Sequence, residues 1–200
     1  KSVLMESARS RAADCHRSAV RKASMQRPLQ FETLLPSHLD ELATVLLHPA
    51  VYEHIADSVP SRETFTRNCE RALVGPAAGS TNQIWLNYLV RGSSGMMIGR
   101  LEATLHDSVA EVAFLFGPCY WGNGYASEGL QWLHSEITRG YDISTFWATT
   151  VPENTRCQRV LRRTGYAPAL QPFPMLFSYS AGDLAFVRVD RSAERRCEFP

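Results

Sequence analysis

The sequence predicts a mixed α/β protein with helices on both faces of one central sheet. Apolar residues recur at helical spacing over residues 37–73, alternate with polar residues over residues 84–116, and return to helical spacing after residue 124. The expected order is one strand, two helices, three strands, a helix, a strand, a helix and two strands. This order suits a single sheet on which helices pack.

The first part of this fold is predicted from local patterns. Residues 28–36 are bounded by prolines and favour a strand. An apolar stripe predicts a helix over residues 37–48, and a second helix is expected over residues 61–73, where Ser61 is a natural N-cap. These helices precede a loop rich in Gly, Ala and Ser.

Three strands are expected next, over residues 84–91, 96–105 and 110–116. In the second strand apolar and polar residues alternate, which gives one apolar face. The third strand reads AEVAFLF and is expected to be buried on both faces.

The remaining elements alternate between helix and strand. A helix is expected from Gly124 to Gly140, which would stop it, and a strand over residues 143–150. A short helix follows, with Asn154 as N-cap and Gly165 just past its end. Two final strands are expected over residues 176–180 and 184–190.

The composition is that of an ordinary soluble globular protein, with 44% hydrophobic and 20% charged residues. A net charge of +1 argues against a nucleic-acid binder, and no apolar run approaches the roughly 20 residues that span a bilayer. The five cysteines form no CxxC pair and no zinc-like spacing with histidine. We therefore expect free thiols, no metal and a cytoplasmic protein.

Both ends differ from the middle of the chain. Residues 1–27 carry seven Lys or Arg against two acidic residues, a segment charge of +5, and contain no apolar leader segment. We expect residues 1–27 to be a basic extension, residues 28–190 to form one domain, and residues 191–200 to be a polar tail.

A glycine-rich bend, YWGNGYASEG at residues 120–129, lies between the most apolar strand and a helix. The first N–H groups of a helix have no partner within it and carry partial positive charge. Gly122 and Gly124 lack a Cβ, so a large group can approach the backbone. The bend predicts a cradle for a phosphate or pyrophosphate, or else a tight turn without a ligand.

Two common phosphate-binding motifs do not fit this bend. The residues Gly-Tyr-Ala that follow Asn123 differ from the Gly-Lys-Ser/Thr of NTPase loops. A dinucleotide site needs an acidic residue at the end of the next strand, which here ends in Thr-Thr.

The tract over residues 112–166 resembles the GNAT superfamily of acetyl-coenzyme A-dependent N-acetyltransferases. It is most similar to the branch that includes the ribosomal-protein N-terminal acetyltransferases. That branch favours an aromatic-Trp-Gly-x-Gly-Tyr-Ala-x-Glu motif, matched by residues 120–128, and an Asn-led helix ending in Gly-Phe or Gly-Tyr, matched by residues 154–166. The resemblance implies the GNAT fold, a mixed and mostly antiparallel sheet that splays after its fourth strand.

The resemblance also implies acetyl-CoA as co-substrate. Its pyrophosphate would bind the backbone of Trp121, Gly122, Asn123, Gly124, Tyr125 and Ala126. Its pantetheine would pair with free backbone groups of Phe114, Leu115 and Phe116. Asn154 would hold the pantetheine arm, act as a helix cap, or do both.

The implied reaction is direct transfer of the acetyl group to a primary amine, either a peptide N-terminus or a small molecule. The alternative is a GNAT-fold module that binds coenzyme A or a protein partner without catalysis. A homodimer is compatible with either reading. The acceptor would lie between the two N-terminal helices and the region of residues 172–179, where no acidic cluster favours a strongly polycationic amine.

Candidate catalytic groups are fewer than the family pattern suggests. Glu102, or less favourably Glu111, is a candidate base, directly or through water, although a sheet carboxylate is also commonly salt-bridged. Many relatives carry a Tyr where this chain has Leu161, and the ribosomal branch often carries a Ser where it has Cys157.

Cys157 would donate to the departing sulfur or only fill space, and its position at a helix N-terminus is expected to lower its pKa. His106 and His134 are expected at the surface, and Tyr125 and Tyr166 in structural roles. Cys119 is expected to be an apolar filler.

Overall fold

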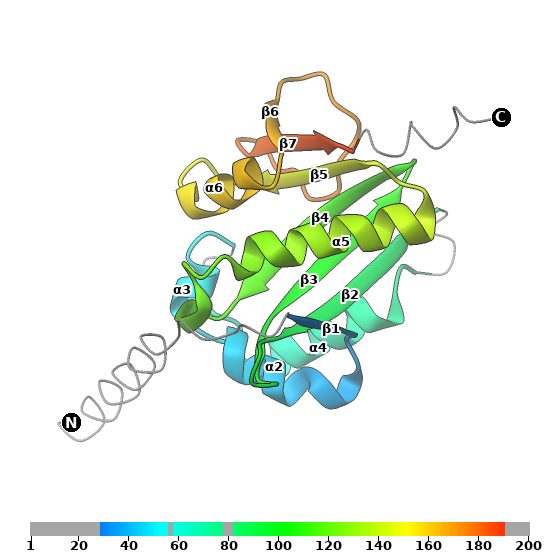
Figure 1. Ribbon diagram of the computed structural model, residues 1–200. Coiled ribbons are helices and arrows are strands. Elements are labelled where there is room, and N and C mark those ends of the chain that lie inside the picture. Colours follow the sequence, from blue (N-terminus) through cyan, green and yellow to red (C-terminus); the bar gives the residue numbers. More distant parts are fainter. Residues whose placement is uncertain (1–28, 56–57, 78–81, 191–200) are drawn as a thin grey trace.

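The computed structural model describes residues 29–55, 58–77 and 82–190 (Figure 1). The extension expected over residues 1–27 and the tail expected over residues 191–200 lie outside this part of the chain. Seven strands form one sheet in the order β1-β2-β3-β4-β5-β7-β6. Among the strands of the described residues, β4 and β5 alone pair in parallel, and the other neighbours are antiparallel. The predicted mixed, mostly antiparallel sheet is confirmed.

The strands are β1 (Gln30–Thr33), β2 (Ile84–Arg91), β3 (Met97–His106), β4 (Val109–Phe116), β5 (Thr145–Thr150), β6 (Ala167–Ala169) and β7 (Leu184–Val189). The helices are α2 (Leu39–Leu46), α3 (Pro49–Tyr52), α4 (Arg62–Val74), α5 (Tyr125–Tyr141) and α6 (Thr155–Arg163), with 3-10 turns η1 (Pro36–His38) and η2 (Pro118–Tyr120).

Two elements differ from the prediction. Helix α3 was not predicted, because four residues are too few for a helical stripe. The strand next to β7 is β6, not residues 176–180. A proline at position 168 hid β6 from pattern analysis, although proline is tolerated on an edge strand.

Two hydrophobic clusters cover the two faces of the sheet. On one face α5 packs Leu130, Leu133 and Ile137 against the apolar side of β3, including Leu101. On the other face, α2 and α4 enclose a second cluster around Phe65. Figure 1 shows α5 crossing one side of the sheet, with α2 and α4 on the opposite side. The helices therefore lie on both faces, as predicted.

The helix ends follow local chemistry. The side chains of Ser61 and Asn154 cap α4 and α6 as predicted, and Gly165 follows α6 with φ of 90°. Helix α5, however, continues through Gly140 and ends at Tyr141, and its C-cap residue Asp142 has φ of 55°. Asp tolerates this left-handed conformation, so a glycine was not needed to end α5.

Strands β4 and β5 separate after a short stretch of pairing. Residues Val109–Glu111 pair with Thr145–Trp147, whereas β4 stays paired with β3 as far as Phe116. The burial expected along the whole of β4 holds for residues 110–112, but Ala113 is exposed and the next two residues are half-buried. The predicted splay of the sheet after its fourth strand is confirmed.

The described residues can be compared with the expectations about membrane spans, metal sites and free thiols. Within residues 29–190, leaving out the two undescribed gaps, no helix is long and apolar enough to cross a bilayer. Nor do three His, Cys, Asp or Glu side chains of the described residues gather in a way that could hold a metal ion. Cys69 and Cys157 are free, but Cys119 is disulfide-bonded, so the expectation of a free filler thiol there is wrong. Cysteine pairing cannot be read from spacing alone.

The contact between β3 and β4 leaves no room beside Gly99. A Cβ at this position would collide with the Leu115 carbonyl oxygen and lie 2.7 Å from Cδ1 of Phe116. We expect Gly99→Ala to lower the free energy of unfolding by about 1–3 kcal/mol, as overpacked cores do, measured by urea denaturation. The control is Gly140→Ala in α5, where a Cβ meets nothing within 4 Å and should be neutral or stabilising by up to about 1 kcal/mol. Equal stability of the two variants would contradict the predicted collision.

Candidate active site

A cavity of about 760 Å3 opens where β4 and β5 separate. One wall comes from β4 and the start of α5, and a second comes from β5 and α6. A third wall comes from α3, from His54 and Ile55 just after it, and from the loop before β7. The volume is in the range of ligand pockets, and pockets commonly occur where strands of a sheet diverge.

The end of β4 presents backbone groups to this cavity. The Gly117 N–H donates to the Ile98 carbonyl of β3 at 3.0 Å, and hydrogen-bonded pairs alternate along an antiparallel ladder. The N–H and C=O of Phe114 and the N–H of Phe116 therefore face the opening. The backbone groups of Leu115 face β3, which stands against the backbone role predicted for this residue, although Leu115 also lines the cavity.

The predicted bend forms a glycine loop, residues 121–124, at the N-terminus of α5. Gly122 and Gly124 have φ of 81° and 83°, a conformation that favours glycine, and open space lies in front of both. The Ser127 and Glu128 N–H groups donate to the Gly124 carbonyl at 3.0 and 3.1 Å. Among the described residues, none accepts a hydrogen bond from the N–H groups of residues 122–126. The loop is thus open and rich in free donors.

Two side chains next to the loop point away from the cavity. The Asn123 amide donates to the Tyr120 and Trp121 carbonyls at 3.1 and 3.2 Å, so this side chain braces the loop. Glu128 accepts from the Leu29 N–H at 3.3 Å. Neither carboxylate nor amide therefore lies in front of the free N–H groups, and an anion can approach them.

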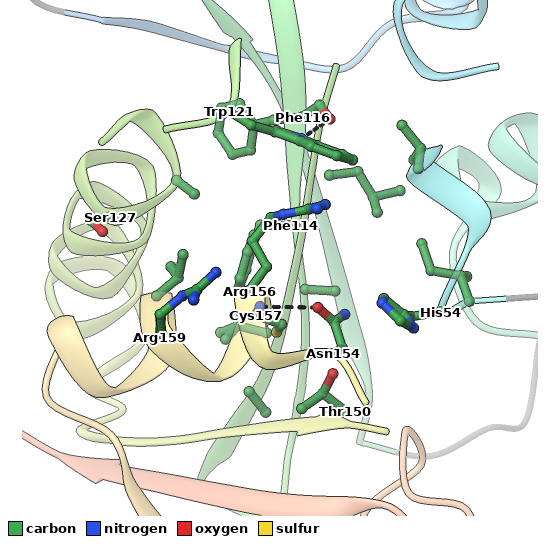
Figure 2. A pocket seen from close by; sticks show the side chains of 18 of the residues that line it. His54, Phe114, Phe116, Trp121, Ser127, Thr150, Asn154, Arg156, Cys157 and Arg159 are labelled. Atoms are coloured by element: carbon green, nitrogen blue, oxygen red, sulfur yellow. Dashed lines mark hydrogen bonds between the residues drawn. The ribbon is translucent and has the colours of Figure 1, made fainter. Parts of the chain in front are cut away.

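The N-terminus of α6 forms the opposite wall. Asn154 Oδ1 accepts from the Cys157 N–H at 3.0 Å, which is the predicted cap. Figure 2 shows the nitrogen of the same amide group turned into the cavity, so the cap leaves it available to a ligand. Thr150, at the end of β5, lies beside it and was not singled out by the sequence.

Cys157 lines the cavity as a neutral thiol. Burial raises its pKa to about 11, and a hydrogen bond with Thr150 only partly opposes this effect. The lowered pKa expected from the helix N-terminus is therefore wrong, because desolvation of the thiolate outweighs the helix dipole. At neutral pH the group is a hydrogen-bond donor.

Glu102 combines a place at the cavity with the salt bridge that is common for sheet carboxylates. It lines the cavity, and it is ion-paired with the buried Arg100 on the same strand. Arg100 also donates to Asn87 Oδ1 at 3.1 Å, and burial lowers its pKa. An ion pair stabilises a carboxylate in its charged form and so opposes its protonation.

Glu111 lies away from the cavity and holds a loop. Its carboxylate is 2.7 Å from His106 Nε2 and accepts from the Phe177 N–H at 2.7 Å and from the Ser178 N–H at 2.9 Å and hydroxyl. These bonds explain why residues 176–180 are not a strand, since their backbone donors serve Glu111. Its placement contradicts the hypothesis that Glu111 is a base.

Positive charge gathers on the α6 side of the cavity. Arg156, Arg159 and Arg163 line it, and the Arg156 guanidinium lies 3.8 Å from the centre of the Trp121 ring (Figure 2). The Trp121 Nε1–H donates to the Phe116 carbonyl at 2.7 Å, which fixes the ring. This wall suits an anionic ligand.

The third wall contains residues that the sequence did not single out. His54 and Ile55, just after α3, line the cavity together with Ser180 and Asp183 from the loop before β7. No pattern pointed to His54, because it is a lone histidine between the two helices expected over residues 37–48 and 61–73. Only the tertiary fold brings it opposite Asn154 (Figure 2).

Two other histidines, His106 and His134, are core residues, contrary to expectation. His106 and His134 are 4% and 2% exposed. His134 Nε2 lies 2.8 Å from the Tyr166 hydroxyl, and burial lowers the pKa of His134 to about 3 and raises that of Tyr166. A neutral imidazole with a hydrogen-bond partner can be buried at little cost. Leu161, where relatives carry a Tyr, is fully buried in the same core.

Comparisons with known proteins agree with this architecture. The sequence model of the acetyltransferase (GNAT) domain matches residues 29–167. No curated protein matches the sequence significantly.

Three similar solved structures share the fold at low sequence identity. An acetyl transferase from Salmonella typhimurium that modifies the N-terminal serine of ribosomal protein L7/L12 has a TM-score of 0.66 and 19% identity, over 82% of this chain and 95% of that one. AAC(6')-Ib in complex with paromomycin and acetyl-CoA has a TM-score of 0.66 and 13% identity, over 86% and 99%. Spermidine N-acetyltransferase from Vibrio cholerae in complex with CoA and spermine has a TM-score of 0.64 and 10% identity, over 83% and 98%.

The family match covers strands β1 to β5, the glycine loop and α6, ends at the first residue of β6, and spans well over half of the chain. The chain therefore belongs to the GNAT family of acetyltransferases.

Proposed function

We propose that this chain transfers an acetyl group from acetyl-CoA to a primary amine by direct attack within a ternary complex. The observation that carries the proposal is a single cavity that joins the glycine loop, the unpaired end of β4 and the third wall beside His54. An anionic nucleotide carrier and a second substrate can therefore meet within one opening.

The described residues fit acetyl-CoA, which supplies the acetyl group as a reactive thioester. The free N–H groups of residues 122–126 suit a pyrophosphate. The backbone groups of Phe114 and Phe116 suit the pantetheine amides, with the Asn154 amide opposite them. Arg159 and Arg163 suit the remaining phosphate.

Acetyl transfer to an amine has three chemical requirements. The amine must lose a proton, the thioester carbonyl must be polarised, and the sulfur must be stabilised as it leaves. A thiolate is a fair leaving group, so no covalent enzyme intermediate is required, and holding the two substrates in line supplies much of the acceleration. Glu102 remains a candidate base.

Cys157 acts in this proposal as a hydrogen-bond donor to the sulfur. An ordinary thiol has a pKa of about 8.5, which is lower than the value of about 11 for Cys157. Full proton transfer from Cys157 to a coenzyme thiolate would therefore be uphill. The neutral S–H group stabilises the leaving sulfur without giving up its proton.

The third wall favours an amine with a single positive charge. Two carboxylates line the cavity, Glu102 of β3, which Arg100 already neutralises, and Asp183 of the third wall. Ala50, Val51 and Ile55 supply apolar surface beside them. One free carboxylate and an apolar wall suit a peptide N-terminus or small monoamine better than a polyamine or an aminoglycoside.

Thiol release tests the proposal directly. The purified chain is incubated with acetyl-CoA and a panel of short peptides, amino acids, polyamines and aminoglycosides. We expect release of free coenzyme thiol with peptides or monoamines. Binding of CoA without thiol release for any amine would instead support a non-catalytic module.

The glycine loop can be tested by adding a negative charge. Gly124→Glu places a carboxylate in front of the free N–H groups, and we expect CoA affinity to fall at least tenfold by calorimetry. Gly95→Glu is the matched control, because Gly95 has φ of 80°, has open space around it, and lies in the β2–β3 turn. Equal affinity of both variants would show that the loop does not bind the diphosphate.

The state of Cys157 predicts a distinctive pH dependence. Because burial raises its pKa to about 11, the thiolate fraction should keep rising through the range in which an ordinary thiol is already ionised. We expect the rate of iodoacetamide labelling at Cys157 to increase about tenfold per pH unit between pH 8 and 10, followed by mass spectrometry. Cys157→Ala identifies the labelled site. A rate that levels off near pH 9 would contradict the raised pKa.

A further inference from the structure

We propose that His54 is the catalytic base that takes the proton from the ammonium form of the acceptor. This inference rests on the proposed acetyl transfer and adds a residue to it. It starts from the position of His54 at the third wall of the cavity, where the acceptor must lie if the coenzyme occupies the glycine loop and β4.

The geometry places His54 beside the expected reaction centre. The Pro49–Tyr52 helix and its buried Val51 hold the segment against the cavity. Figure 2 shows the His54 ring and the Asn154 amide pointing toward one another across the opening, with Cys157 next to Asn154. The His54 side chain is 25% exposed, so it is accessible to a substrate and can also return a proton to water.

The competing groups are less suited to accept this proton. Glu102 is held in its ion pair with Arg100. Cys157 is a neutral donor. Glu111 lies outside the cavity and is engaged by the loop donors of Phe177 and Ser178. An imidazole, in contrast, changes charge between about pH 5 and 8 and exchanges protons readily at neutral pH.

The charges around His54 are mixed. On its own segment, Glu53 Oε2 lies 4.0 Å from His54 Nε2, too far for a hydrogen bond. Across the cavity, the lining carries the acidic residues Glu102 and Asp183 and the basic residues Arg156, Arg159 and Arg163. His54 therefore makes no close hydrogen bond to Glu53, and the cavity that it lines holds charges of both signs.

The protons and bonds of the reaction balance with His54 in this role. The ammonium gives one proton to the imidazole, and the neutral amine attacks the thioester carbon, forming the C–N bond. The C–S bond then breaks, and the second nitrogen-bound proton ends on the coenzyme sulfur. His54 releases its proton to water, so each turnover yields the amide, the free thiol and one proton.

The test compares His54→Gln with His48→Gln in the full chain. Gln keeps a polar side chain of similar size but cannot accept the proton. His48 is exposed, lies outside the cavity lining and only accepts from the Ala50 N–H, a bond that Gln can replace. The probe amine is the tetrapeptide Ser-Ala-Ala-Tyr, or whichever panel amine the unaltered chain acetylates fastest.

We expect His54→Gln to lower kcat/KM for the amine about 100-fold at pH 7, with the Kd for CoA changed less than twofold. The pH profile of kcat/KM should lose its rise between pH 5 and 8, which His48→Gln should keep. His54→Gln cannot take the proton from the ammonium form, so its kcat/KM should instead rise near pH 8, where the free peptide amine loses its own proton.

The other outcomes overturn the inference in distinguishable ways. An active wild-type chain whose His54→Gln variant keeps its rate and pH profile would refute the role of His54 alone. Weaker CoA binding by His54→Gln, or an equal loss in His48→Gln, would indicate a structural effect instead of proton transfer. A wild-type chain that binds CoA but acetylates no amine would refute the proposed function, and the base with it.

Discussion

The loss of pairing between β4 and β5 beyond Glu111 is the constraint on which the rest of the structure depends. A continuous sheet would use the backbone groups of Phe114 and Phe116 in its own ladder and would leave no cavity. Once the strands diverge, those groups need other partners, because unpaired backbone groups away from water are costly. Trp121 satisfies one of them by donating to the Phe116 carbonyl. The remaining groups face an opening that a ligand with amides can fill.

Something must hold the two halves of the sheet while the middle stays open. The Glu111 carboxylate does this at the closed end, because it joins β4 to the loop before β7 through Phe177 and Ser178. The Thr149 hydroxyl donates to the Ser178 carbonyl at 2.8 Å and adds a link from β5. Ser178 and Asp183 of this loop line the third wall. A buried carboxylate that resembled a catalytic group in the sequence therefore serves to place the wall against which an acceptor would bind.

Local patterns predicted much of the fold, and the reasons for the failures are physical. The caps at Ser61 and Asn154 and the bend at Gly122 and Gly124 depend on neighbouring residues only, so the sequence reveals them. Other properties depend on what packs around a residue from distant parts of the chain. Burial reversed the expected pKa shift of Cys157. Tertiary packing also placed His106 and His134 in the core and His54 at the cavity. The direction in which the backbone of Leu115 faces also depends on distant residues, because only the register between β3 and β4 decides it.

The stacking of Arg156 on Trp121 has a consequence for how a bulky nucleotide enters. Trp121 follows β4 and Arg156 follows β5, so this contact bridges the two strands where their own ladder has ended. A cation–π contact at a partly exposed site contributes only about 0.5–1 kcal/mol, far less than a run of ladder hydrogen bonds. This contact can therefore open at a much lower cost than the strand pairing of the sheet. The two strands are thus held together weakly by Arg156 and Trp121 on one side of the cleft, and strongly by their own hydrogen bonds where they pair.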